Sequence, residues 1–328
     1  MKITNCPSTL SSGYETHSPI AIKHLFDGKK VSPFLPYASD GSKMEIIESV
    51  GRISLSGVQA KFSMNIGDDL KLHYTKKDES GKYILKPAPT SLHLFDREFC
   101  PANENLTMQI ASQVFKIDTA ANGLCFFNDG KAAYITKRFD YDKNGKKLPQ
   151  EDFASLGGFT KASGGSDYKY KNASYEECGE IIKRYVGAPA IELLKFFNIV
   201  VFNFLFLNDD AHLKNFSLIK RNGIYRLAPA YDLMNTALHL GMPQIFALEK
   251  GLFKEGMALS DTRWVQRKDF EEFGRRIGLS EKTVTNSLDF LCGEHSEVKD
   301  LVSRSYLSEP LKKNYFDGYE YRRKMIYK

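Results

Sequence analysis

The chain has 328 residues, 42% hydrophobic and 26% charged, which is typical of a globular protein. Its 46 Lys and Arg residues against 40 Asp and Glu residues give a net charge of +6, without the run of like charges that marks a polyelectrolyte tail. The five cysteines are odd in number and form no CxxC pair, so they indicate neither a disulfide framework nor a cysteine zinc site.

The sequence shows no signal for export or for membrane insertion. Its first residues lack the basic start and continuous apolar run of a signal peptide. The most apolar stretch, residues 191–207, is broken by Glu, Lys and Asn and falls short of the ~20 residues that cross a bilayer. We therefore expect a cytoplasmic protein, with these residues forming a buried helix.

The front half of the chain is rich in β-prone runs. Residues 1–50 are mixed in composition and indicate an N-terminal extension, after which a small α+β lobe is expected over 51–139. The predicted elements of this lobe are strands at 52–64 and 81–89, a helix at 101–115 and a hairpin at 123–139.

The pattern changes to helical spacing after Phe139. Helices are predicted at 149–158, 174–186, 188–207, 267–277, 280–291 and 294–307. Residues 160–172, rich in Gly and Lys, are typical of a mobile surface loop that could contact a substrate. We predict an α+β protein with a strand-rich N-lobe, a helical C-lobe over 140–328 and a site in the cleft between the lobes.

Residues 207–235 place many polar side chains next to the apolar helix. The Asn-Gly pair at 222–223, between two β-prone runs, predicts a two-residue hairpin because both residues tolerate positive φ. If strand pairing continues in that register, Asp232 lies opposite Leu213 and therefore beside Asn215.

Asp210, Asn215 and Asp232 are then expected to converge at one mouth. Two carboxylates and an amide oxygen form a hard oxygen site, which suits Mg²⁺ bound to substrate phosphates better than zinc. Asp210 and Asn215 also have the spacing of kinases in which the Asp is the base and the Asn, five residues later, holds a metal. The alternative is that the two residues only cap helix ends.

Phosphoryl transfer also needs a lysine for the phosphates and a loop that covers them. Lys86, at the end of a predicted strand, is the candidate lysine, and Glu104 on the next helix is its candidate ion-pair partner, with Glu98 as the alternative. Gly57 lies in the candidate phosphate loop. Lys86 could equally be a solvated surface lysine, as isolated strand lysines usually are.

Six ordered blocks resemble the HipA-like toxin Ser/Thr kinases of bacterial toxin–antitoxin systems. The blocks are RISLSGVQAKFSM, YILKP, ITKRFD, LPQEDFASLGG, NDDAHLKNFSL and LAPAYDLMNT, and they cover residues 52–236. The resemblance implies a two-lobed protein-kinase-like fold and an enzyme that uses ATP and Mg²⁺.

By this resemblance, several residues acquire expected roles. Asp210 is the catalytic Asp, Asn215 and Asp232 are the metal ligands, and Lys86 is the phosphate lysine. Residues 137–139, with Lys137 and Phe139 at their ends, are the hinge to adenine, and His212 and Asp140 lie near the nucleotide. Ser54 is the loop serine that such kinases autophosphorylate, and Ser56 is a second acceptor candidate that also lies in the phosphate loop. His212 could instead be a hydrogen-bonded structural histidine.

The resemblance also implies partners. They are a protein substrate such as an aminoacyl-tRNA synthetase, a DNA-binding antitoxin, and a separate small protein in place of the N-terminal subdomain that longer relatives carry and this short, HipT-like form lacks. Direct binding of nucleic acid is not expected, because no basic helix-turn-helix is visible. Two other functions stay open: a kinase of small molecules or lipids, and a catalytically silent module that binds the antitoxin.

Overall fold

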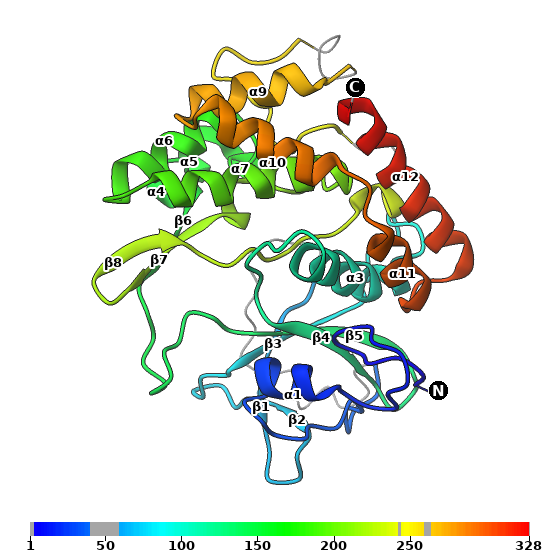
Figure 1. The fold of residues 1–328 in the computed structure, drawn as a ribbon. Helices are drawn as coiled ribbons and strands as arrows, with labels where there is room; N and C mark the ends of the chain where they lie inside the picture. The colour runs from blue at the N-terminus through cyan, green and yellow to red at the C-terminus, as the bar shows by residue number, and fades with distance from the viewer. Residues whose placement is uncertain (1–2, 40–58, 242–243, 259–263, 328) are drawn as a thin grey trace.

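The computed structural model describes residues 3–39, 59–241, 244–258 and 264–327, which form two lobes (Figure 1). An antiparallel five-stranded sheet makes up most of the N-lobe, and helices packed around α7 (Ala190–Leu205) make up most of the C-lobe. The predicted α+β fold with a strand-rich first lobe and a helical second lobe is confirmed.

The N-lobe sheet has the strand order β2-β1-β3-β5-β4. Its strands are β1 (Phe62–Ile66), β2 (Leu72–Tyr74), β3 (Tyr83–Pro87), β4 (Asn122–Phe126) and β5 (Ala132–Lys137). Successive side chains of a strand point to opposite faces. Tyr83 and Leu85 on β3 therefore join one core, while Lys86 points to the other face, toward helix α3 (Cys100–Gln113).

The N-terminal segment is part of this lobe. Residues 3–39 contain α1 (Pro19–Leu25), and the backbone of this segment bonds to the edge strand β4 at Leu124 and Phe126. Phe26 is fully buried, and its ring lies 5.9 Å from that of Tyr83. The sequence indicated only an extension here, because these residues have no regular periodicity of their own.

Most apolar residues of α7 are buried, and the other C-lobe helices pack on it directly or on one another. They are α4 (Phe153–Leu156), α5 (Lys161–Gly164), α6 (Tyr175–Tyr185), α9 (Arg267–Arg276), α10 (Glu281–Cys292), α11 (Ser296–Arg304) and α12 (Glu309–Tyr327). The predicted cap of α6 is present as a capping box between Ser174 and Glu177. Phe206 stacks on Tyr319 at 4.7 Å and so joins the end of α7 to α12.

Short 3-10 turns connect several of these elements. They are η1 (Arg97–Phe99), η2 (Gly165–Asp167), η3 (Leu213–Asn215) and η4 (Thr236–Leu238). The segment 160–172, expected as a surface loop, contains α5 and η2 and then lies against the C-lobe through a bond from Leu213 N to the carbonyl of Lys169.

The predicted Asn-Gly hairpin is confirmed in its turn and register. It consists of β7 (Ser217–Arg221) and β8 (Ile224–Leu227), with Arg221 opposite Ile224 and Leu218 opposite Leu227. Pairing ends soon afterwards, with the bond from Ala228 N to Ser217 O. The ladder does not continue to Leu213 as expected, because residue 230 turns to bond with residue 118 across to the other lobe.

The predicted helix at 149–158 is shorter than expected. Its first residues form β6 (Gln150–Asp152), which pairs with β7. Asp152 then caps α4, accepting from Ser155 N at 2.9 Å. A sheet partner that is distant in sequence therefore decides the conformation of these residues.

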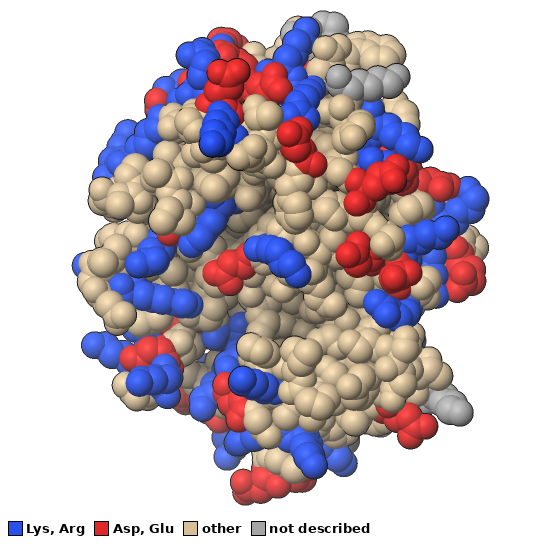
Figure 2. Space-filling model, in the orientation of Figure 1, with Lys and Arg blue, Asp and Glu red and all other residues tan. Residues whose placement is uncertain are grey.

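The molecular surface shown in Figure 2 mixes both signs of charge. On this face Lys and Arg side chains are interspersed with Asp and Glu side chains instead of gathering into one field. Within the described part of the chain, no helix has the length and apolarity needed to span a membrane.

Burial of Phe26 predicts a measurable role for the N-terminal segment in stability. Phe26→Ala should lower the free energy of unfolding by about 3–5 kcal/mol, the usual cost of emptying a buried aromatic site. Urea unfolding of the full chain measures this change. Ile20→Ala, on the same segment but 65% exposed, is the matched control and should have little effect. Equal stabilities of the two variants would show that the segment is a detached extension.

Candidate active site

A cleft of about 720 Å³ separates the two lobes. Its walls carry charged side chains from both lobes. Those that line it are Lys61, Lys86, Glu104, Asp167, Lys169, Lys171, Asp209, Asp210, Asp232 and Glu249. Such a concentration of ionisable groups in one concave site is typical of a binding or catalytic centre.

Lys86 joins the two lobes through ion pairs. Its Nζ donates to Glu104 Oε1 at 2.6 Å and also to Asp232 Oδ1, while Lys61 Nζ lies 3.5 Å from Asp232 Oδ2. Lys86 and Glu104 are each 4% exposed. The structure therefore brings Lys86, Glu104 and Asp232 together, and Glu98 is not the partner of Lys86.

Burial and charge pull the pKa values of this cluster in opposite directions. Burial lowers the pKa of Lys86, but Asp232 and Glu104 outweigh it and the net pKa lies above the ordinary value. For Asp232, burial raises the pKa, and the two lysines outweigh it and hold the pKa well below the ordinary value. For Glu104, burial prevails over Lys86 and raises the pKa. Lys86 is therefore charged at neutral pH and held in place from both sides.

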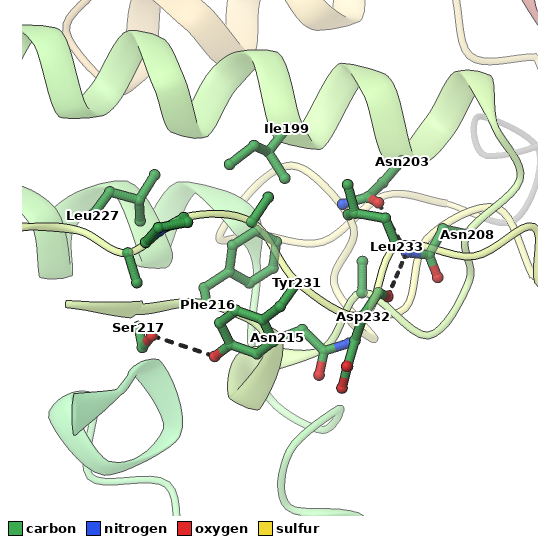
Figure 3. Close-up of a pocket in the computed structure, with 14 residues that line it drawn as sticks. Ile199, Asn203, Asn208, Asn215, Phe216, Ser217, Leu227, Tyr231, Asp232 and Leu233 are labelled. Atoms are coloured by element: carbon green, nitrogen blue, oxygen red, sulfur yellow. Dashed lines mark hydrogen bonds between the residues drawn. The ribbon is translucent and has the colours of Figure 1, made fainter. Parts of the chain in front are cut away.

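Asn215 and Asp232 line one small pocket beneath the cleft, although the strand ladder does not connect them (Figure 3). The Asn215 amide nitrogen donates to the Asp210 carbonyl at 2.9 Å, so the amide oxygen is the atom left to face a cation. Figure 3 shows the Asn215 and Asp232 side chains pointing the same way. Asp232, five residues after the end of β8, has a φ of 57°, in the left-handed region.

These donors fit Mg²⁺ as its protein ligands. Mg²⁺ commonly takes one or two carboxylates from the protein and completes its shell with water and substrate phosphates. Asp232 and Asn215 offer one carboxylate and one amide oxygen, and the described residues hold no group of three or more His, Cys, Asp or Glu side chains placed for a metal. The donor set therefore suits a cation that arrives with its substrate.

The loop after α7 fixes Asp210 at the edge of the cleft. Its carbonyl accepts from His212 N at 2.8 Å, and its carboxylate Oδ1 accepts from the hydroxyl of Tyr170 at 2.5 Å. His212 is buried, and burial lowers its pKa to about 4, so the ring is neutral at pH 7. Its Nε2 lies 4.0 Å from Asp210 Oδ1. The His212 ring packs edge-to-face on that of Tyr170 at 4.9 Å, and His212 is not among the residues that line the cleft.

One predicted nucleotide contact, Lys137, does not face the cleft. Lys137 is paired in register with Tyr83, so its side chain is on the sheet face opposite Lys86, where it forms an ion pair with Asp27. This alternation along the strand removes the Lys137 side chain from the cleft.

Asp140 and Phe139 have partners within the protein. Both Asp140 oxygens accept from Arg138, at 2.9 and 2.6 Å, and the Phe139 ring packs 5.6 Å from that of Tyr231. The hinge expectation for the backbone of 137–139 stays a prediction. Ser54, Ser56 and Gly57 lie outside the described residues.

Two cleft residues whose side chains pair with the predicted carboxylates were not predicted from the sequence. Lys61 lies in the block that contains the candidate phosphate loop, directly before β1, and this position was the available signal. Tyr170 lies in the segment interpreted as a mobile loop, and its contact with Asp210 has no local signature because the two residues are 40 positions apart.

The fold and the cleft define a two-lobed, kinase-like class of protein. Within that class, the chain belongs to the HipA-like C-terminal domain family, whose model matches residues 53–298.

Relatives with similar sequences carry kinase names. A "Putative kinase" from Haemophilus influenzae is 29% identical over 322 residues, covering 91% of this chain and 88% of the relative. A second, from Sinorhizobium fredii, is 26% identical over 288 residues, covering 84% of this chain and 64% of the relative.

Two solved structures share the fold. HipA of Shewanella oneidensis MR-1, in a complex with HipB and operator DNA, aligns with a TM-score of 0.65 at 18% identity, over 88% of this chain and 71% of HipA. The Helicobacter pylori proinflammatory kinase CtkA aligns with a TM-score of 0.52 at 15% identity, over 82% of this chain and 90% of CtkA.

The buried Lys86 cluster predicts an asymmetric response to mutation. Lys86→Met leaves the Glu104 carboxylate buried without its cation and should cost about 3–5 kcal/mol of unfolding free energy. Glu104→Gln leaves Lys86 paired with Asp232 and should cost less, about 1–3 kcal/mol. Denaturant unfolding at pH 7 measures both. Lys82→Met, an exposed lysine next to β3, is the control. A Lys86→Met variant as stable as the Lys82→Met variant would contradict a charge-balanced cluster.

Proposed function

We propose that this protein is an ATP- and Mg²⁺-dependent protein kinase that phosphorylates serine or threonine. The observation that carries the proposal is the meeting, in one cleft, of a Glu-paired lysine from the N-lobe with Asp210 and Asp232 from the C-lobe. Asn215 lines a small pocket together with the same Asp232. Phosphoryl transfer depends mainly on positioning and charge, and these are the parts it needs. The kinase names of two relatives and of CtkA support the same conclusion.

Each residue has a distinct role in this proposal. Asp232 and Asn215 would hold Mg²⁺, which would neutralise negative charge on the phosphates of ATP. Lys86, held by Glu104, binds the phosphates. Asp210 lies at the edge of the cleft, where it accepts the proton of the attacking hydroxyl.

We further propose that the kinase is the toxin of a toxin–antitoxin pair. HipA of Shewanella oneidensis occurs in a complex with HipB and operator DNA, and a DNA-binding antitoxin is the corresponding partner here. The proposed target is a translation protein such as an aminoacyl-tRNA synthetase, and a separate small protein is a second proposed partner. There are two alternative functions. A kinase of small molecules or lipids would differ in the acceptor of the phosphate, and a silent binding module would differ in having no catalytic turnover.

Replacement of the catalytic carboxylate provides the first test. Asp210→Asn should reduce transfer of phosphate from labelled ATP to protein by about 10²–10⁴-fold, the usual contribution of a general base. Asp232→Asn should also abolish transfer and should weaken the Mg²⁺-dependent binding of ATP, which Asp210→Asn should retain.

The same assay contains its control. Asp300→Asn, an exposed carboxylate on α11, should leave transfer unchanged. Labelling of lysate proteins identifies a protein kinase, whereas labelling of sugars or lipids alone supports the first alternative. If neither the wild-type chain nor the Asp210→Asn variant turns over ATP, the result would support the silent binding module.

Modification of the phosphate loop provides a second test. Phosphopeptide mass spectrometry should find Ser54 or Ser56 phosphorylated in cells that express the wild-type chain and unmodified in the Asp210→Asn variant. Each phosphoserine adds about −1.5 to −2 charges at pH 7, which repel the ATP phosphates. Calorimetric titration should therefore show weaker ATP binding by the loop-phosphorylated form. Equal affinity of both forms would rule out this switch.

A further inference from the structure

The carboxylate of Asp210 already has a hydroxyl donor in the structure. Tyr170 donates its phenolic hydroxyl to Oδ1 of Asp210 at 2.5 Å, and among the described residues this is the hydrogen bond shown for that carboxylate. The Asp210 side chain is 52% exposed toward the cleft. One oxygen is therefore occupied from the protein side, and Oδ2 is available to a substrate.

Tyr170 is held in place on several sides. Its ring packs edge-to-face on His212 at 4.9 Å, with the Lys169 Nζ 4.8 Å from the ring centre. Its carbonyl accepts from Glu249 N at 2.9 Å, and Leu213 N donates to the carbonyl of Lys169 at 3.1 Å. These bonds join the segment to the same loop that carries Asp210, so the hydroxyl and the carboxylate are fixed relative to each other.

The phenol also keeps its proton. Burial, followed by the charge of Asp210, raises the pKa of Tyr170 well above its ordinary value. A phenol that stays protonated donates to the carboxylate at any physiological pH, and donation to a charged acceptor gives a strong, well-directed bond.

We propose that Tyr170 is a positioning residue of the kinase site: its hydroxyl holds Asp210 Oδ1 so that Oδ2 faces the acceptor hydroxyl. The inference rests on the proposed kinase function. In the step it serves, a bond forms between the acceptor oxygen and the γ-phosphorus while the bond from that phosphorus to the β–γ bridging oxygen breaks. The acceptor proton passes to Asp210 Oδ2, and ADP leaves.

A competing role for Tyr170 is that of a plug that occupies the acceptor position and must leave before the substrate binds. The contacts of the Tyr170 ring and of the flanking backbone favour a fixed support. A plug would have to break these contacts each time the substrate binds. The two roles predict opposite effects when the hydroxyl is removed.

Tyr170→Phe removes the hydroxyl and retains the ring that packs on His212. Initial rates of ATP hydrolysis, with water as acceptor, avoid the need for an identified protein substrate. We expect kcat to fall about tenfold, because small misplacements of catalytic groups cost up to 10²-fold, with KM for ATP and the melting temperature unchanged. Tyr225→Phe, a tyrosine on β8 outside the residues that line the cleft, is the matched control and should match the wild type.

A double-mutant cycle separates positioning from a general structural effect. If Tyr170 acts through Asp210, Tyr170→Phe should cause no further loss in the Asp210→Asn background. An unchanged or increased kcat in Tyr170→Phe, or an additive loss in the double variant, would overturn the inference about Tyr170. The kinase proposal would still stand in each case if the wild type is active. A wild-type chain without phosphotransfer would overturn both.

Discussion

The site depends on one buried cation balanced by two carboxylates from different lobes. Lys86 comes from a sheet strand, Glu104 from α3 and Asp232 from the segment that follows the C-lobe hairpin. Taking charges out of water is costly, and only close partners with good geometry offset that cost. The requirement to pair these charges fixes how the lobes face each other and gives the cleft its polarity.

In the proposed function, the same arrangement would receive a metal-bound nucleotide. Asp232 is stabilised as a carboxylate by lysines, and a cation with phosphates could take over both sides of that pairing: the metal for Asp232 and the phosphates for Lys86. Glu104 would then keep Lys86 oriented while the partner of Lys86 changes from Asp232 to the phosphates. A hydrogen bond between uncharged groups also joins the lobes: Asn103 on α3 donates to the carbonyl of Asn235 at 2.7 Å.

Much of this could be predicted because several signals are local. The Asn-Gly turn set the hairpin register because both residues accept positive φ, and Ser174 marked the start of α6 because a capping box lies within one turn. The Lys86–Glu104 pair followed from a strand and a helix that are close in sequence. Asn215 and Asp232 do line one pocket, as expected, but not through the predicted strand pairing. The ladder ends before it reaches them, and Asp232 lies in a left-handed turn.

The sequence by itself determined the two-lobed class and the short segments that bring Lys86, Asp210 and Asp232 to the site, since spacing and residue type carry that information locally. Tertiary structure alone decided the rest. Packing against β4 placed residues 3–39 in the N-lobe, strand alternation turned Lys137 away from the cleft, and the fold brought Tyr170 to Asp210. Contacts between residues that are far apart in the chain arise from the packing of whole elements, which leaves no periodicity or motif in either local segment.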